Sequence, residues 1–336
     1  MPLISEILAP INEDIKRLEE EMNELVDSSL EPLTGSSSYL LSSGGKRLRP
    51  ALLLLSGKLF DYEFEKVKPL AIAVELVHMA SLVHDDVIDD SRLRRGSEAV
   101  NYKWGNKVAV LSGDLLYTFA ANSLAGLEDS KYLKHLLKAA LEMTRGQANQ
   151  TINKGHLKLS FDDYLKRIRQ KTALLIGKSC LLGAKASGAG AEEQSRMEKY
   201  GVNLGISFQI TDDVKDLIGS REELGKDPGN DLKEGTLTLP IMVALEKTSR
   251  DDFFRTVLKK ENPGKEEIRR GIEVVKSSGA VKESLNYSRK FAEEANSALP
   301  DHSEGLKAVT ALRVAARYFG GEEINGKSYI GQEQPV

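Results

Sequence analysis

Two clusters of aspartates, each at the end of an apolar helical stretch, constrain this chain more than any other sequence feature. The first cluster comprises Asp85, Asp86 and Asp89. The second comprises Asp212, Asp213 and Asp216. The run before the first cluster, AIAVELVHMASLVH, contains no Gly or Pro and therefore predicts a helix. Because residues three and four apart share one face of a helix, each DDxxD pattern groups its carboxylates.

Grouped carboxylates at the end of a buried helix repel one another unless a cation lies among them. Mg2+ takes oxygen ligands, commonly one or two carboxylates together with the phosphates of a substrate. Arg94 and Arg95 follow the first cluster, and guanidinium groups bind phosphate in a bidentate manner. One acidic cluster alone is compatible with a solvated helix end. Two copies, each followed by basic residues, predict two walls of one site for metal ions and phosphate groups.

The rest of the chain also has the pattern of helices. Apolar segments of helical length alternate with Pro and Gly breaks, and no segment shows the alternation of a strand. The main predicted helices span 12–27, 51–60, 106–127, 131–155, 161–188 and 193–218. Several are apolar on more than one side, which is typical of helices inside a large bundle. We therefore predict a single all-α domain over residues 1–336.

Charge and composition exclude several classes of protein. The 47 basic and 50 acidic residues give a net charge of −3, and the basic residues form no patch suited to nucleic acid. The one cysteine, Cys180, excludes an intramolecular disulfide and agrees with a reducing, cytoplasmic compartment. The N-terminal segment lacks the basic region of a secretory signal. No run of 18 or more apolar residues occurs, so we expect no transmembrane segment.

A basic motif with two glycines, GGKRLRP at 44–50, is the next candidate element. It brings Lys46 and Arg49 close together in the sequence, and its glycines permit close approach of a ligand to the backbone. Taken alone, it would suit a surface turn before a helix with Pro50 in its first turn. Together with the aspartate clusters, it predicts a binding site for a diphosphate.

Glu75 and His78 form an ExxH pair, a pattern that also binds iron in some helix bundles. A di-iron site needs a second such pair, and none of the other histidines follows a glutamate by three residues. We therefore expect His78 to lie in the core or to contact a diphosphate. Gln147 and Gln209 are polar residues on apolar helices, so each suits either a buried hydrogen bond or a ligand contact.

In order and spacing, these motifs resemble those of trans-isoprenyl diphosphate synthases (polyprenyl synthetases) of the long-chain type. The matching segments are GGKRLRP, HDDVIDDSRLRRG, GQ at 146–147, KT at 171–172, FQITDDVKD and GKDPGNDL. The resemblance covers about residues 30–320. It implies an all-α helix bundle around a central cavity, usually a homodimer. It also implies Mg2+-dependent, head-to-tail condensation of isopentenyl diphosphate with an allylic diphosphate, either farnesyl or geranylgeranyl.

The resemblance implies a role for each matching residue. Both aspartate clusters would bind Mg2+, with about three ions in an active site that holds substrate. The allylic diphosphate would be held by Arg94, Lys171, Lys226 and Gln147. Isopentenyl diphosphate would be held by Lys46, Arg49, His78 and Arg95. The residues that act near the reacting carbons would be Lys171, Thr172, Gln209 and Lys226.

The chain departs from the family pattern at two positions. Thr236 stands where a lysine is common, and Gln150 stands where an acidic residue is usual. Neither change touches the aspartate clusters, so we expect an active enzyme. A terpene cyclase is disfavoured because the second aspartate cluster and GGKRLRP are both present.

Ala80 and Ser81 are the candidate chain-length residues, five and four positions before Asp85. At about 1.5 Å of rise per residue, they lie about 6–8 Å along the helix from this carboxylate. Small residues here resemble the long-chain enzymes, so we expect a product longer than C20, of about C30 to C40. The alternatives are a geranylgeranyl diphosphate synthase (C20) and, from another class, a non-catalytic partner subunit of a heteromeric synthase.

Overall fold

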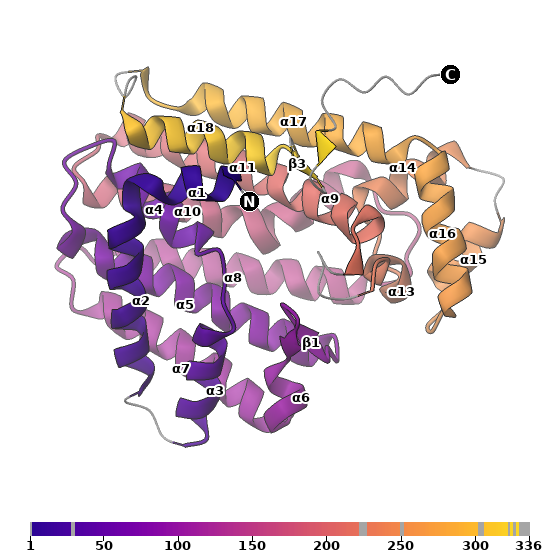
Figure 1. The fold of residues 1–336 in the computed structure, drawn as a ribbon, viewed down its shortest axis with the longest axis horizontal. Helices are drawn as coiled ribbons and strands as arrows, with labels where there is room; N and C mark the ends of the chain where they lie inside the picture. Colours follow the sequence, from indigo (N-terminus) through magenta and orange to yellow (C-terminus); the bar gives the residue numbers. More distant parts are fainter. Residues whose placement is uncertain are drawn as a thin grey trace. The chain divides into compact units, whose positions relative to one another are not determined.

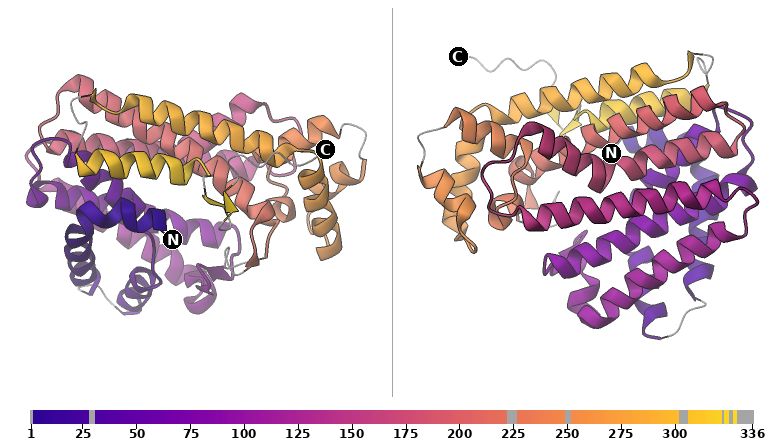
Figure 2. Two further views of the ribbon diagram at one scale, coloured as in Figure 1. Left: turned by 45° about the horizontal axis from the view of Figure 1, so that its top comes forward. Right: turned by 180° about the vertical axis from the view of Figure 1, so that it is seen from behind.

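The computed structural model is built almost entirely of helices, and it describes residues 2–27, 31–221, 227–248, 252–301, 306–321, 323–324 and 327–328. The chain forms two compact units. Unit 1 comprises Met1–Leu141, Leu175–Gly201 and Ala298–Ala315. Unit 2 comprises Glu142–Leu174, Val202–Ser297 and Ala316–Val336. Figures 1 and 2 trace the helices along the chain by colour.

Unit 1 holds the first helices of the chain, which short loops connect. They are α1 (Pro2–Leu8), the 3-10 turn η1 (Ala9–Ile11), α2 (Asn12–Asp27), α3 (Leu33–Ser42), α4 (Leu48–Gly57), α5 (Phe64–Ile88), α6 (Val100–Trp104) and α7 (Asn106–Ala125). The strands β1 (Leu93–Arg94) and β2 (Ser97–Glu98) form a small antiparallel hairpin. In the sequence, this hairpin follows the first aspartate cluster directly.

Helix α5 is the central element of unit 1 and packs against α4 and α7 (Figure 1). It is apolar on most sides, and Leu70, Val74 and Leu76 are fully buried. Burying an aliphatic side chain of this size stabilises the fold by about 1.5–3 kcal/mol. The apolar run therefore fixes α5 in the core, and the aspartates at its C-terminal end are carried by a rigid helix.

Unit 2 holds most of the C-terminal half. Its own elements are α9 (Phe161–Ile168), the π-helical turn η2 (Arg169–Ala173), α13 (Asn230–Glu234), α14 (Leu239–Lys247), α15 (Asp252–Lys259), α16 (Lys265–Ser277), β3 (Glu323–Ile324) and β4 (Lys327–Ser328). Five helices contribute residues to both units: α8 (Lys131–Ile152), α10 (Leu174–Ala186), α11 (Ala191–Ile218), α17 (Ala280–Ala298) and α18 (Lys307–Phe319). The core of unit 2 includes the fully buried Tyr164, Ile210 and Phe254.

The prediction of an all-α fold is confirmed, and α2 has the predicted bounds of 12–27. The helix predicted over 161–188 is present as a continuous helical segment over 161–186, in which the π-helical turn η2 joins α9 to α10. An apolar pattern cannot indicate such a turn, which depends on packing against other segments. Whether the two units make up a single domain over 1–336 stays a prediction.

Candidate active site

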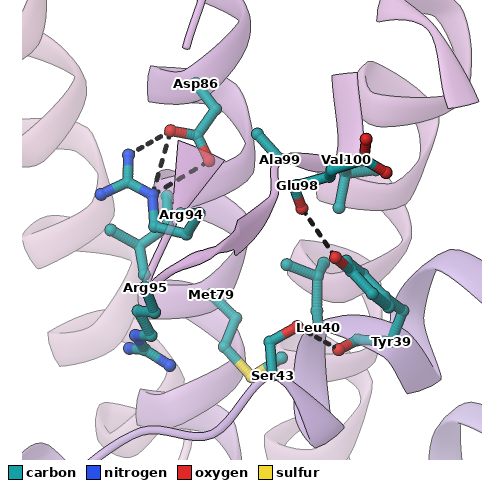
Figure 3. Close-up of a pocket in the computed structure, with 11 residues that line it drawn as sticks. Tyr39, Leu40, Ser43, Met79, Asp86, Arg94, Arg95, Glu98, Ala99 and Val100 are labelled. Atoms are coloured by element: carbon teal, nitrogen blue, oxygen red, sulfur yellow. Dashed lines mark hydrogen bonds and ion pairs between the residues drawn. The ribbon is translucent and has the colours of Figure 1, made fainter. Parts of the chain in front are cut away.

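The first aspartate cluster lies at the C-terminal end of α5, and its three carboxylates differ in environment. Asp86 is only 2% exposed, whereas Asp85 and Asp89 are half-buried. Both carboxylate oxygens of Asp86 accept hydrogen bonds from Arg94 Nε at 3.0 Å, and Arg94 Nη2 also contacts Oδ1 (Figure 3). Asp86 therefore anchors Arg94 beside the cluster, and the two outer aspartates remain accessible from solvent.

The hairpin of β1 and β2 turns the chain back after the cluster. Arg95, with φ 53°, and Gly96, with φ 81°, form its left-handed turn. Arg95 Nη1 donates a hydrogen bond to the carbonyl of Gly44, in the GGKRLRP motif. A Cβ atom at Gly45 would lie 2.6 Å from the same nitrogen, so a side chain there would displace the Arg95 guanidinium from this position. The structure thus brings the RRG and GGKRLRP motifs together.

Arg47, whose charge is part of the predicted basic motif but which was given no role of its own, fastens the GGKRLRP loop to the core. Its Nη1 atom lies 3.1 Å from Glu75 Oε1, its Nε atom 2.9 Å from Glu19 Oε1, and its Nη2 atom donates to the Leu41 carbonyl at 2.9 Å. Burial lowers the pKa of Arg47, but the two carboxylates outweigh this effect and leave the pKa raised. Glu75 is therefore the ion-pair partner of a buried arginine, which removes the basis for a di-iron reading.

His78 lies on α5 beside a concentration of positive charge. Its pKa is well below the usual value, first because of burial and then because of Arg49, Arg95, Arg94 and Arg47. The neutral imidazole can donate one hydrogen bond, and the arginines supply the charge that an anion needs. Lys46 is exposed in the loop before α4, and Arg49 is half-buried in the first turn of α4. All four predicted isopentenyl diphosphate ligands belong to unit 1, and Arg49 and Arg95 lie close enough to His78 to lower its pKa.

A small, open pocket lies along one flank of α5 (Figure 3). Met79, Asp86, Arg94 and Arg95 line it, together with residues of α3 and α6 such as Tyr39. The Tyr39 hydroxyl donates to the Glu98 carbonyl at 2.9 Å. The pocket therefore combines an apolar wall with the two arginines that follow the first cluster.

The candidate chain-length residues occupy different environments. Ala80 is fully buried, whereas Ser81 is half-buried and its hydroxyl donates to the His78 carbonyl at 2.8 Å. That bond satisfies the hydroxyl within the helix, so Ser81 presents little polar surface to a neighbouring hydrocarbon. A larger side chain at Ser81 has more room than one at Ala80.

The second aspartate cluster, on α11 in unit 2, also divides into buried and exposed carboxylates. Asp212 is exposed, while Asp213 and Asp216 are each 6% exposed. Asp213 accepts hydrogen bonds from the Tyr164 hydroxyl at 2.7 Å and from Gln209 Nε2 at 2.8 Å. Asp216 accepts one from the backbone N–H of Asp231 at 3.0 Å. Asp216 therefore holds the start of α13, and Asp213 is held by side chains.

Burial raises the pKa of Asp213 to about 7, and Asp212 adds to this effect. The hydrogen bonds from Gln209 and Tyr164 and the charge of Arg167 act in the opposite direction. A nearby cation stabilises the charged form of a carboxylate whose pKa burial has raised. The environment of the cluster therefore suits the binding of a metal ion.

The π-helical turn η2 places Lys171 and Thr172 within unit 2. A Cβ atom at Gly146 would lie 2.8 Å from the backbone nitrogen of Lys171, so the GQ motif owes its glycine to this close contact. Lys171 Nζ donates to Gln150 Oε1 at 3.1 Å. Because Gln150 is neutral where the family has an acidic residue, it accepts this bond without cancelling the charge of the lysine.

Thr172 and Gln209, predicted to lie near the reacting carbons, are directly connected. The Thr172 hydroxyl donates to Gln209 Oε1 at 2.7 Å. Gln147 is buried, with 9% of its surface exposed. Thr236, which with Gln150 departs from the family pattern, is also buried. Lys226, a predicted ligand of the allylic diphosphate, lies outside the described residues.

The carboxylates of the aspartate clusters suit Mg2+ whose remaining ligands come from substrate phosphates and water. Among the residues that the structure describes, no group of three His, Cys, Asp or Glu side chains is arranged to hold a metal ion. Mg2+ commonly binds through one or two carboxylates, several waters and substrate phosphates, so a preformed cage is not required. In unit 1, the half-buried Asp85 and Asp89 are oxygen donors of this kind, and in unit 2 the exposed Asp212 is another.

Sequence reasoning missed Arg47 and Tyr164, both of which hold other site residues in place. Arg47 lies inside a motif that was singled out, so its charge was visible but its burial was not. Tyr164 precedes the KT motif by seven residues, on a helix with an ordinary amphipathic pattern. Nothing in the sequence distinguishes it from a core tyrosine.

Comparison with known proteins agrees with this geometry. The family model of polyprenyl synthetase matches residues 31–287. A heptaprenyl diphosphate synthase component 2 from Geobacillus stearothermophilus is 38% identical over 315 residues, covering 92% of this chain and 96% of the relative.

Solved structures of similar proteins share the fold. A polyprenyl synthase from Caulobacter crescentus, complexed with calcium and isoprenyl diphosphate, superposes with a TM-score of 0.90 at 30% identity, covering 94% of this chain and 97% of that one. A decaprenyl diphosphate synthase from Rhodobacter capsulatus superposes with a TM-score of 0.87 at 29% identity, covering 95% and 99%.

Proposed function

Because this chain belongs to the polyprenyl synthetase family and is a long-chain trans-prenyltransferase, we propose that it condenses isopentenyl diphosphate with farnesyl or geranylgeranyl diphosphate in the presence of Mg2+. The observation that carries this proposal is the end of α5. There, the half-buried Asp85 and Asp89 lie next to Arg94, which Asp86 holds in place. Carboxylates for a metal ion and a guanidinium for phosphate are the two groups that an allylic diphosphate requires.

In this proposal, the two substrates are held by different groups. Asp85 and Asp89 hold Mg2+ on the allylic diphosphate, and Arg94 binds its phosphate oxygens. Lys46, Arg49, His78 and Arg95 bind isopentenyl diphosphate, supported by the positive charge around His78. Within unit 2, Asp212 is proposed as a metal ligand and Lys171 as a phosphate ligand. Bound Mg2+ neutralises the charge that develops on the departing diphosphate.

The reaction needs no side chain of the protein as a base. The C–O bond of the allylic diphosphate breaks, and the double bond of isopentenyl diphosphate attacks the allylic carbon. One proton then leaves the new prenyl chain, and the released diphosphate accepts it. The apolar helices around the cluster exclude water, which would otherwise trap the allylic cation.

We propose a product longer than C20, of about C30 to C40. The small side chains of Ala80 and Ser81 precede the first cluster by one turn of α5, and the half-buried Ser81 is the one of the two that a growing prenyl chain would be able to reach. The relative that is called heptaprenyl diphosphate synthase component 2 supports this range, since seven C5 units make C35. The one that is called a decaprenyl diphosphate synthase (C50) supports a product longer than C20. A geranylgeranyl diphosphate synthase is the less favoured alternative.

We propose that the active form is a homodimer. Val110 and Leu111 on α7, and Leu137 and Leu141 on α8, are large apolar side chains of unit 1 and are 41–54% exposed. A second copy that covers them would remove apolar surface from water. The name "component 2" of one relative supports the alternative that a different subunit covers this face.

By length and composition, α5 and α7 would each be able to cross a membrane. However, 67% of the apolar window of α5 is buried inside the protein, as is usual for a core helix, against 33% for α7. The exposed side of α7 is the one that the proposed dimer would cover. A cytoplasmic location is part of the same proposal, and the buried thiol of Cys180, whose pKa burial raises to about 12, is in keeping with it.

A pair of neighbouring variants tests the proposed reaction. Asp89→Asn removes a predicted metal ligand, whereas Asp90→Asn changes an exposed aspartate that lies outside the DDxxD pattern. Asp90 has a φ of 47°, which asparagine also adopts, so the control preserves the backbone. We expect Asp89→Asn to lower Mg2+-dependent condensation at least about 100-fold and Asp90→Asn to lower it less than about threefold. Equal activities of the two variants would refute the assignment of the metal site.

A further inference from the structure

We propose that Tyr164 is a positioning residue for the second aspartate cluster. Through Asp213, it begins a partly buried chain of hydrogen bonds that ends at Thr172 and keeps this threonine and Asp212 in place for metal and allylic diphosphate. This inference rests on the proposed function and assigns a part to a residue that none of the motifs contains. Every member of the chain belongs to unit 2.

The chain consists of three hydrogen bonds in sequence. The Tyr164 hydroxyl donates to Asp213 Oδ2 at 2.7 Å. Gln209 Nε2 donates to Asp213 Oδ1 at 2.8 Å. The Thr172 hydroxyl donates to Gln209 Oε1 at 2.7 Å. All three lengths are short to normal for hydrogen bonds of these types.

With Asp213 ionised, as a bound metal ion would favour, this chain of hydrogen bonds has a fixed direction, because a carboxylate only accepts hydrogen bonds. Asp213 therefore faces the amide NH2 of Gln209, and the amide oxygen faces Thr172. Thr172 has one hydroxyl proton and donates it to this oxygen. If the carboxylate of Asp213 turned away, the amide of Gln209 would be able to rotate and Thr172 would lose its defined orientation.

Tyr164 is suited to hold that carboxylate because its own position is rigid. Its side chain is fully buried, and Asp213 and Thr172 are each only 6% exposed. Its helix, α9, begins with a capping box in which Ser160 Oγ accepts from the Asp163 N–H at 3.1 Å. Phe161 stacks on the ring of Tyr164 at a centroid distance of 6.4 Å. A hydrogen bond in so dry an environment is stronger than one in water.

Arg167 lies one turn after Tyr164 on the same helix, α9. It donates a hydrogen bond to the Leu237 carbonyl and lies 5.6 Å from the ring of Tyr164. The π-helical turn η2 follows directly and leads to Thr172. Such turns are frequent at functional sites, where they redirect a side chain. Here, the turn follows α9, which carries Tyr164, and contains Thr172, the residue at the other end of the chain of hydrogen bonds.

The first aspartate cluster shows the same division of labour within unit 1. There, the middle aspartate, Asp86, is buried and held by Arg94, while its neighbour Asp85 is half-buried. In the second cluster, the middle aspartate, Asp213, is buried and held by Tyr164, while Asp212 is exposed. In both clusters, an anchored carboxylate fixes the helix end from which the more accessible one projects.

Tyr164→Phe removes only the hydroxyl that begins the chain, and Tyr200→Phe is its matched control. Tyr200 is also fully buried and donates to a backbone carbonyl, that of Leu312 at 2.8 Å, but it belongs to unit 1. Both variants lose one buried hydroxyl, so both are expected to melt at a lower temperature. Only Tyr164→Phe is expected to alter metal binding.

The primary measurement is calorimetric titration of Mg2+ into each protein saturated with farnesyl thiodiphosphate, an unreactive analogue of the allylic substrate. We expect Tyr164→Phe to raise the Mg2+ concentration for half-saturation about 5- to 20-fold, and Tyr200→Phe to leave it within about twofold. Equal half-saturation in wild type and Tyr164→Phe would overturn the inference. If the wild-type protein binds no Mg2+ with the analogue, the proposed function fails, and this result is distinct from the first.

A double-mutant cycle tests whether Tyr164 acts through Asp213. In an Asp213→Asn background, the additional change Tyr164→Phe is expected to alter half-saturation by less than about twofold, because the carboxylate that it oriented is gone. A full additional loss in that background would mean that Tyr164 acts by another route, and would overturn the inference. High Mg2+ is expected to restore kcat of Tyr164→Phe towards the wild-type value, which a damaged core would not allow.

Discussion

The buried ion pair of Arg47 and Glu75 gives the most specific prediction of stability. Its side chains are only 5% and 3% exposed, and the two charged atoms lie 3.1 Å apart. The change Arg47→Met keeps the apolar stem of the side chain but leaves the carboxylate of Glu75 without its nearest cation. It also removes the hydrogen bond to the Leu41 carbonyl.

The expected cost follows from this burial. Removing one partner of a buried ion pair destabilises a protein by about 3–5 kcal/mol, because the other charge stays buried without compensation. The double change Arg47→Met with Glu75→Leu removes both charges, and we expect it to recover at least about 2 kcal/mol of the loss. The control Lys66→Met breaks a surface pair whose side chains are 58% and 55% exposed, and we expect a much smaller effect on stability, because solvent and salt screen such a pair.

The assay is urea unfolding followed by circular dichroism, together with kinetics for isopentenyl diphosphate. Because Arg47 holds the GGKRLRP loop, we expect Arg47→Met to raise KM for isopentenyl diphosphate more than KM for the allylic substrate. A destabilisation by Arg47→Met no larger than that of Lys66→Met would refute the reasoning. So would a double variant that is less stable than the single one.

Three further predictions rest on separate features. Gly146→Ala places a methyl group 2.8 Å from the backbone nitrogen of Lys171. We expect it to lower the free energy of unfolding in urea by about 1–3 kcal/mol and to remove most of the activity. The control Gly126→Ala has open space around the new methyl group and should lower the free energy of unfolding by less than about 0.5 kcal/mol. His78 has a lowered pKa in the folded protein, so the unfolded chain binds more protons below about pH 6.5 and stability falls as the pH drops through that range; His78→Gln should flatten this part of the unfolding profile. Ser81→Phe should shorten the main product, as judged by chromatography of the dephosphorylated prenyl alcohols, and an unchanged product length would contradict the placement of the chain-length residues.

Much of the fold was predictable because its cause is local. The apolar run of α5 is long, lacks early breaks and ends in charge, so its helical state and its burial follow from the sequence. Its start at Phe64 was not predicted, since Val67 joins the core only through packing against other helices. The π-helical turn η2 was missed for the same reason, as its position depends on the approach of Gly146.

The candidate site was predictable in its residue types but not in its pairings. Charge and spacing identified Asp86 and Arg94, yet treated both as ligands, whereas the structure pairs them with each other. The position of Tyr164 opposite Asp213 joins residues that are 49 positions apart, and no periodicity encodes such a contact. The role of a residue can be predicted from the sequence when it depends on the residue's type and on its spacing from neighbouring motifs. A role that depends on contact with a residue distant in the sequence cannot be predicted in this way.

The most direct test of the account is the length of the product. The purified protein would be incubated with Mg2+, labelled isopentenyl diphosphate and, in separate reactions, farnesyl and geranylgeranyl diphosphate, and the dephosphorylated products would be separated by chain length. The account predicts Mg2+-dependent products longer than C20 from both primers, centred at about C30 to C40. Products that stop at C20, or no condensation by the protein alone, would contradict it.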